Sequence, residues 1–216
     1  MIKDTKLASG LLRALSALVD ISVWLLVFQL TFLMVVSSVD LYSLLDSLFY
    51  GLIIYVALLT FGIPIINSFM TSRFGGSFGK LLTGTRVVKE DGGTHLSFKM
   101  AFLRNPIGYA VSGLMLGLGF VWLFVDEKKQ TWHDMLVNSL VVVKSKQAYL
   151  LAVVSIVVLT MVNVYMGNVV HKNILENKEL YSGIFEDIKG EIEILKEKEL
   201  LVPEDEFELE DIGALH

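Results

Sequence analysis

Two charged residues, Arg13 and Asp20, lie in an apolar stretch that otherwise suits lipid, LLRALSALVDISVWLL over residues 11–26. Their seven-residue separation is two helical turns, so both side chains share one helix face with Ser16 and Ala17. At 1.5 Å per residue, Asp20 lies about 13 Å from the start of the stretch, near the bilayer midplane. A carboxylate at that depth marks an ion, proton or substrate pathway, or else a polar clasp that holds helices in register.

Asp20 is expected to have a partner, because a central aspartate costs about 2.5–3.5 kcal/mol in a membrane helix. Arg13 is about 10 Å away along the axis, too far for a direct ion pair, and is expected to point to the membrane interface. The candidate partners are Arg104 and the adjacent Lys128 and Lys129. The small residues between the two charges also allow a second helix or a loop to approach this face.

A second group of interest is Trp132-His133-Asp134, in which an imidazole stands beside a carboxylate. Neighbouring residues do not normally face each other, so this dipeptide is weak evidence for metal binding or acid–base chemistry. We expect Asp134 instead to cap a helix or to pair with a basic residue such as Arg104 or Arg86.

Other chemistry is not indicated by the sequence. His95 and His171 have no carboxylate at a metal-ligand spacing, and the chain has no cysteine. The glycine-rich residues 74–80 lack the GxxxxGK[ST] spacing of a phosphate-binding loop. No paired carboxylates and no Ser-His-Asp order stand out. We therefore expect no enzyme activity, metal or cofactor, and no nucleic-acid partner.

The elements that must position these residues are membrane helices. Of 216 residues, 54% are hydrophobic and 19% are charged, and the apolar residues gather into four blocks. Each block has about 20 residues or more, the length needed to cross a bilayer. This predicts an all-α membrane protein with about four membrane segments, the first of them an uncleaved helix. The blocks are residues 11–37, 44–70, 106–125 and 149–170.

Two short polar segments are predicted to form a small β-hairpin-like element. Residues 84–89 and 138–144 have the composition of strands, and residues 90–93 form a turn signal. Basic residues surround these segments and precede the first block, so the positive-inside rule places both the element and the N-terminus in the cytoplasm. Four of these basic residues either contact anionic lipid head groups or only enforce topology. They are Lys80, Arg86, Lys128 and Lys129.

Residues 106–125 have two possible topologies. The block is just long enough to span as one helix, and Gly113 with Gly117 forms a GxxxG pair that suits a packed helix. A re-entrant hairpin is the other possibility, since Gly108 and Gly119 add further flexibility. The hairpin keeps all early basic residues on one side, so the charge rule narrowly favours it. It would place the C-terminal tail outside the cell, whereas a span would place the tail in the cytoplasm.

The C-terminal tail differs from the rest of the chain because it is strongly acidic, while the preceding residues are net basic. Ile184, Ile188, Ile192 and Leu195 recur at helical spacing, which predicts an amphipathic helix outside the lipid core, followed by a disordered acidic end. We divide the chain into a membrane domain (1–146), an additional transmembrane helix (147–171) and the tail (172–216).

Four motifs together resemble the RDD family of bacterial and archaeal membrane proteins. They are LLRALSALVDISVWLL, SFGKLLTGTRVVKEDGG, FLRN and FVDEKKQTWHDMLVNSLVVV, in order from about residue 8 to 144. The family is named for one arginine and two aspartates, and the matching positions are Arg13, Asp20 and Asp134. Asn138-Ser139 departs from the Gly-Thr pair that is usual there, which leaves the turn geometry open.

The resemblance implies transport of an unknown ligand or exchange of cations for protons, since both have been proposed for this family. In such a protein of the cell membrane, Asp20 would titrate, Arg13 would set its field, and Asp134 with Arg104 would organise the cytoplasmic entrance. With few spans, a homo-oligomer is expected to enclose the pathway within the lipid bilayer. The alternative is a non-transporting partner or assembly factor that docks a protein through its acidic tail.

Overall fold

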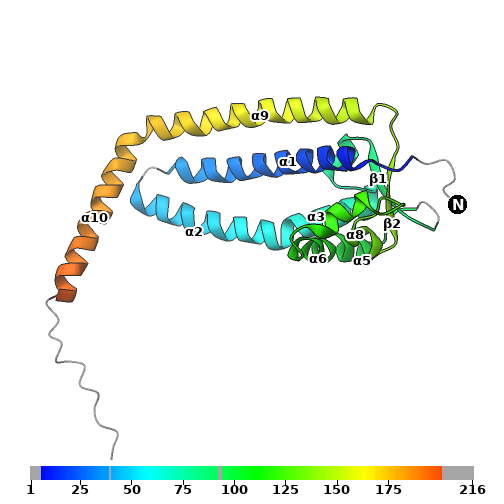
Figure 1. Cartoon of the computed structure of the whole chain (residues 1–216). Coiled ribbons are helices and arrows are strands. Elements are labelled where there is room, and N and C mark those ends of the chain that lie inside the picture. Colours follow the sequence, from blue (N-terminus) through cyan, green and yellow to red (C-terminus); the bar gives the residue numbers. More distant parts are fainter. Residues whose placement is uncertain (1–5, 39, 92–93, 201–216) are drawn as a thin grey trace, which may run out of the picture.

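The structure, a computed structural model, describes residues 6–38, 40–91 and 94–200, and its architecture is mainly helical (Figure 1). Three helical runs are long and apolar enough to cross a membrane, and a fourth is possible if a sharply bent helix pair is counted as one span. This confirms a helical protein with three to four membrane-length segments. The runs are Gly10–Val36, Tyr42–Leu82 and Ala148–Glu176.

The second run is interrupted by a π-helical turn. It contains four consecutive elements, and the π turn lies directly before the one that begins with Ile63-Pro64. Proline has no N–H to donate to the preceding turn and its ring clashes there, so the helix widens locally. At the start of the run, Asp40 and Ser43 form a capping box. The elements are α2 (Leu41–Ala57), η1 (Leu58–Gly62), α3 (Ile63–Phe74) and α4 (Phe78–Leu82).

The two predicted strands are present and pair with each other. β1 (Thr85–Lys89) and β2 (Ser139–Val143) form an antiparallel pair in which Val87 lies opposite Val141. Leu7 adds a bridge to Val142, so the chain before α1 (Gly10–Val36) also joins this element. Both valines and Leu12 of α1 are buried in one core. The sheet therefore fastens the start of the first helix to segments far along the chain.

The third apolar block is bent and is not a straight helix. Two helical arms, Phe98–Leu114 and Leu118–Phe124, meet at 109°. The bend is made by Leu116 and Gly117, whose φ angles are 53° and 80°, a region that glycine tolerates best. The arms consist of α5 (Phe98–Phe102), π-helical η2 (Leu103–Ile107), α6 (Gly108–Leu114), α7 (Leu118–Val121) and the 3₁₀ turn η3 (Trp122–Phe124).

Among the described residues, Gly113 and Gly117 do not pack against a neighbouring helix as a GxxxG pair would. A Cβ on Gly113 would meet nothing within 4 Å, whereas one on Gly119 would lie 2.7 Å from the Cα of Ser112. The close approach at Gly119 packs the second arm against the first. Because β1 precedes the block and β2 follows it, the paired strands bring both ends of the block to one end of the molecule (Figure 1).

The last membrane-length helix, α9 (Ala148–Glu176), lies beside α1 along much of its length (Figure 1). Asn163 joins the two helices, since its Nδ2 donates to the carbonyl of Ser22 over 3.1 Å and its own carbonyl accepts from Gln29 over the same distance. The sequence prediction of a fourth apolar helix is confirmed, and the helix continues several residues past the predicted block.

The amphipathic tail helix is also present, as α10 (Lys178–Leu200), and it points away from the bundle at the end opposite the sheet (Figure 1). Its start is attached to α1, because the Tyr181 hydroxyl donates to the carbonyl of Val36. Ile184 is buried, while Ile188 and Ile192 are exposed. The predicted disordered acidic end, residues 202–216, lies outside the described residues.

Candidate functional site

The charged site is built around the carboxylate of Asp134, which is completely buried. Asp134 lies in α8 (Trp132–Met135), and Thr131 begins this helix with a capping box. The Thr131 hydroxyl donates to Oδ2 of Asp134 over 2.7 Å, and the Thr131 backbone N–H donates to the same oxygen over 3.2 Å. The prediction that Asp134 takes part in helix capping is confirmed.

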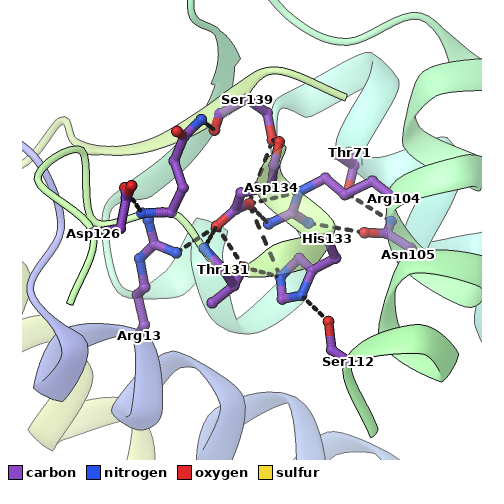
Figure 2. A network of polar contacts seen from close by, with 11 residues as sticks. Arg13, Thr71, Arg104, Asn105, Ser112, Asp126, Thr131, His133, Asp134 and Ser139 are labelled. Atoms are coloured by element: carbon purple, nitrogen blue, oxygen red, sulfur yellow. Dashed lines mark hydrogen bonds and ion pairs between the residues drawn. The ribbon is translucent and has the colours of Figure 1, made fainter. Parts of the chain in front are cut away.

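Two arginines from distant parts of the chain bind this carboxylate (Figure 2). Arg104 donates Nε and Nη2 to Oδ1 over 3.0 and 2.6 Å, and Arg13 donates Nη1 to Oδ2 over 2.6 Å. Burial alone would raise the pKa of Asp134, but the two guanidinium groups outweigh it and hold this pKa well below its ordinary value. Arg86, the other expected partner, donates instead to the Thr85 carbonyl.

Arg104 also links the bent helix pair to α3. Its Nη1 donates to Oδ1 of Asn105 over 2.9 Å, and Nδ2 of Asn105 donates to the Thr71 hydroxyl over 3.2 Å. Arg104 and Asn105 lie in η2, whose π-helical turn contains Pro106. The missing N–H of proline widens this turn, and the buried side chains of Arg104 and Asn105 both take part in the network.

His133 is a structural member of this network. Its Nε2 lies 2.9 Å from the Thr131 hydroxyl and its Nδ1 lies 3.3 Å from the Ser112 hydroxyl, while the Tyr109 ring packs on it edge-on. Burial, followed by the positive charge of Arg104, lowers the pKa of His133 to about 2. The imidazole is therefore neutral at ordinary pH and joins α6 to α8 without carrying charge.

Asp20 has neutral partners, and the expected ion pair with Arg104 or with Lys128 and Lys129 is wrong. The Ser77 hydroxyl donates to Oδ2 over 2.6 Å, and the Gly79 backbone N–H donates to Oδ1 over 2.7 Å. These two donors stand at the start of α4, so Asp20 caps that helix from α1. The proposed cations are used elsewhere, since Arg104 binds Asp134 and Lys128 forms an ion pair with Glu90.

The loop predicted to approach the Asp20 face is α4 with its preceding turn. A Cβ on Gly79 would lie 1.9 Å from the Ser16 carbonyl oxygen and 2.9 Å from the carboxyl carbon of Asp20. Only glycine permits this approach, because any side chain would collide with backbone. Ser16 on α1 and Gly79 on α4 together allow the Gly79 N–H to reach the carboxylate of Asp20.

Arg13 turns toward the buried Asp134 at the sheet end of the molecule. Its side chain is 10% exposed. Its Nε and Nη2 are buried and have no hydrogen-bond partner among the described residues. Buried polar groups are almost always hydrogen-bonded, so these two donors are exceptional.

The departure at Asn138-Ser139 keeps the properties of the Gly-Thr pair it replaces. Asn138 has a φ of 47°, in the left-handed region that glycine and asparagine tolerate best. The Ser139 hydroxyl lies 3.3 Å from the Asp134 carbonyl and 3.4 Å from its Oδ1. A hydroxyl at this position therefore completes the shell around the carboxylate.

Beside this network lies a cavity of about 600 Å³. Its lining comes from α1, α3, the bent helix pair and α4 with the turn before it, together with single residues of α8 and β2. Four charged side chains line it: Arg13, Asp20, Lys80 and Arg104. Asn67 also lines it, and its Oδ1 is a buried acceptor without a partner in the part of the chain that the structure describes. The charged network thus forms one wall of a space large enough for a small molecule.

The cavity continues along α1 into two smaller, mostly apolar ones. The second, of about 340 Å³, shares Ile21, Trp24 and Ile63 with the first. The third, of about 190 Å³, shares Phe28 and Tyr55 with the second. The three cavities form a groove between α1 and the α2–η1–α3 run, charged only at the end near the sheet.

The four basic residues considered as lipid contacts are in different surroundings. Lys80 lines the cavity, Arg86 is hydrogen-bonded to backbone, and Lys128 is paired with Glu90, while Lys129 is exposed. Across residues 6–38, 40–91 and 94–200, no group of three His, Asp or Glu side chains has a metal-binding arrangement.

Sequence reasoning missed the neutral members of the site. Ser77 and Gly79 bind Asp20, and Thr71 with Asn105 extends the network around Arg104. The glycine-rich stretch before Lys80 was a usable signal, since close backbone approach needs glycine. Thr71 and Asn105 carry no comparable signal in the sequence.

The comparison with protein families matches residues 7–138 to a family described as the RDD family. Comparisons with curated proteins and with solved structures give no match. The matched range contains the three residues that resembled the family signature, and the geometry separates them. Arg13 and Asp134 contact each other, whereas Asp20 binds α4.

Proposed function

This chain belongs to the RDD family, and we propose that it is a multi-pass transport protein that carries a small ligand across the cell membrane. The ligand binds in the cavity at the sheet end and moves along the groove between α1 and the α2–η1–α3 run. The basic residues around the sheet support a cytoplasmic position for that end and for the N-terminus.

The observation that carries the proposal is the line of three cavities with shared walls. A receptor or scaffold needs one site, whereas a carrier needs a route from one membrane face to the other. The groove follows α1 from the residues around Arg13 to the residues around Val35, close to the other end of this membrane-length helix. The groove therefore has the extent that a transport route requires.

A hinge for opening and closing the groove is available at η1. This π-helical turn supplies Leu58 and Leu59 to the wall of the middle cavity. π-helical turns are weak points of helices and are frequent at functional sites. Bending there would move α2 relative to α3 and would alternately open each end of the groove.

Alternating access can be tested without knowing the ligand, because the chain has no cysteine of its own. Ala17→Cys places one thiol in the cavity, and Lys129→Cys and Ser182→Cys mark the two ends of the molecule. An impermeant maleimide is applied to intact cells and to inside-out vesicles. Each marker should label from one membrane face only, and the two markers should label from opposite faces. Ala17→Cys should label from both faces. Labelling of Ala17→Cys from one side only would exclude transport through the groove.

Proton coupling is the form of transport in which Asp20 would act, because its carboxylate lines the cavity. Cation movement against protons would require Asp20 to exchange the donors Ser77 and Gly79 for a cation or a proton. Proteoliposomes of wild type and Asp20→Asn, tested with Na⁺, K⁺ and Li⁺ in turn, measure this. Loss of cation-driven proton movement in a folded Asp20→Asn protein supports exchange, and equal movement in both excludes Asp20 as the coupling group.

A second candidate function, docking of a protein partner, is favoured by α10. Phe185, Ile188 and Leu195 are exposed on an otherwise acidic helix that points away from the bundle (Figure 1). An apolar strip on a charged helix fits a groove on another protein. Removal of residues 178–216 should abolish function in that case, while Asp20→Asn leaves it intact. The opposite pattern favours transport.

A further inference from the structure

We propose that the ligand is an anionic amphiphile, with an oxyanion head bound by Arg13 and Lys80 and an apolar chain lying in the groove. The oxyanion is a carboxylate or a phosphate, from a free fatty-acid-like molecule or from a membrane lipid. This deepens the proposed function, since it names the substrate class for the same cavity. Binding of such a ligand can be measured whether or not it is transported.

The charges that line the cavity require an anion for balance. Three cations, Arg13, Lys80 and Arg104, line it together with the carboxylate of Asp20. Asp134 behind the wall neutralises a further charge, and His133 stays uncharged. The site therefore keeps an excess of positive charge in a largely apolar setting, where an uncompensated charge is unfavourable.

The geometry also supplies unused donors. Arg13 binds Asp134 through Nη1 alone, and its Nε and Nη2 have no acceptor among the described residues. The Lys80 ammonium makes no ion pair or hydrogen bond within the same part of the chain, although it lies close enough to influence Tyr109 and His133 electrostatically. Both cations line the same cavity, and a guanidinium and an ammonium in one site are a common combination for binding a carboxylate or a phosphate.

The rest of the groove suits a hydrocarbon chain. Beyond Trp24 and Ile63, the second cavity is lined by side chains such as Leu25, Phe28 and Leu59. Several of these residues are exposed in the isolated chain and would border lipid in a membrane. A ligand with one charged end and one apolar end matches this distribution, whereas a wholly polar anion would leave most of the groove without a complementary surface.

Binding is measured by tryptophan quenching, because Trp24 lies in the wall shared by the first two cavities. The full chain is placed in nanodiscs of neutral phosphatidylcholine and titrated with bromododecanoate. The expected result is saturable quenching that Trp24→Phe removes, together with much weaker quenching by the uncharged methyl ester. Equal affinity for the acid and its methyl ester would overturn the proposal.

Lys80→Gln tests the head-group site without disturbing the Asp134 network, since the ammonium has no partner there. We expect the dissociation constant for bromododecanoate to rise about tenfold or more, as for loss of a charge-assisted hydrogen bond. Lys129→Gln is the matched control, because Lys129 is exposed outside the cavity. Thermal unfolding shows that both variants are folded, and equal dissociation constants in the two variants would overturn the proposal.

Competition distinguishes the sources of the oxyanion. Displacement of the probe by phosphatidylglycerol added to the nanodisc identifies a membrane lipid head group, and displacement by dodecanoate alone identifies a free amphiphile. Acetate or inorganic phosphate competing as well as dodecanoate would overturn the role of the groove. So would disulfide cross-linking between two copies at Phe28→Cys, because the groove would then be an interface between protomers.

These results are separable from those on transport. Ala17→Cys labelled from one side only, together with saturable binding that depends on Lys80, would reject transport while leaving the amphiphile site intact. Alternating access without amphiphile binding would reject the substrate class alone.

Discussion

The aspartates at positions 134 and 20 differ in the partners that hold them. Asp134 is fully buried and accepts hydrogen bonds from two arginines and a threonine. Asp20 borders a cavity and accepts from a serine hydroxyl and a glycine N–H. A buried charge is stable only with opposite charges and complete hydrogen bonding, whereas a carboxylate beside a cavity can be held by neutral donors. Asp134 therefore joins distant segments through charge, whereas Asp20 joins α1 to α4 through two neutral donors.

The largest effect is expected for Asp134→Asn, which keeps the size of the side chain and removes its charge. Arg13 and Arg104 would be left buried without a counter-charge, a loss of about 3–5 kcal/mol. Chemical unfolding in detergent should show this decrease in the free energy of unfolding. Glu90→Gln is the control, because it breaks the exposed ion pair with Lys128 and should cost less than about 1 kcal/mol. Equal losses in the two variants would contradict the role of Asp134 as the counter-charge that stabilises the fold.

The next effect is expected for Gly79→Ala, which separates Asp20 from its donor. The added methyl group would collide with the Ser16 carbonyl, and overpacking of this kind costs about 1–3 kcal/mol or more. Gly113→Ala is a matched control, since its methyl group meets nothing within 4 Å. It should be neutral or stabilise the helix by about 0.5–1 kcal/mol. A destabilised Gly113→Ala with an unaffected Gly79→Ala would contradict the close contact of α4 with α1.

The buried His133, next to Asp134, is expected to make the free energy of unfolding depend on pH. Its pKa falls from 6.5 to about 2 on folding, so the unfolded chain binds a proton that the folded chain excludes. Stability from this group is complete above pH 6.5 and is lost as the pH falls, by about 1.4 kcal/mol per pH unit. His133→Gln should flatten this part of the stability curve between about pH 6.5 and pH 5. An unchanged slope in His133→Gln would exclude His133 as the source.

The smallest effect is expected for Asp20→Asn. An asparagine side chain still offers an oxygen to the Gly79 N–H, so only part of the cap is lost, about 1 kcal/mol. The same unfolding measurement applies, and the loss should be clearly smaller than for Asp134→Asn. A comparable loss in both variants would show that the charge of Asp20 stabilises the fold as much as the charge of Asp134 does.

Several features of the fold could be predicted because they depend on local pattern. Apolar blocks of membrane length became helices, and the two strand segments paired as expected. The expected partnership of Asp134 with Arg104 also followed from residue type, since a carboxylate in a basic region finds an arginine. The bend in the third block was one of two possibilities; the distribution of basic residues narrowly favoured it, and the glycines only allowed it.

The partner of Asp20 could not be predicted, because charge alone was the guide. A search for a cation led to Arg104 and Lys128, while the actual donors are a hydroxyl and a backbone N–H. A backbone N–H has no side chain to reveal it, and the glycine-rich stretch before Lys80 was the one indirect signal. The partner of Arg13 could not be predicted either, because this carboxylate lies 121 residues away along the chain.

The sequence by itself determined the membrane class, the helical blocks, the strand pair and the chemical types gathered at the charged end, because hydrophobic length and residue type are local properties. Only the tertiary structure decided which aspartate meets the arginines, where α4 touches α1, and that a charged cavity continues into an apolar groove. Those features arise from contacts between segments far apart in the chain. They depend on the close fit of glycine against backbone and on pairing charges away from water, and neither can be read from one segment alone.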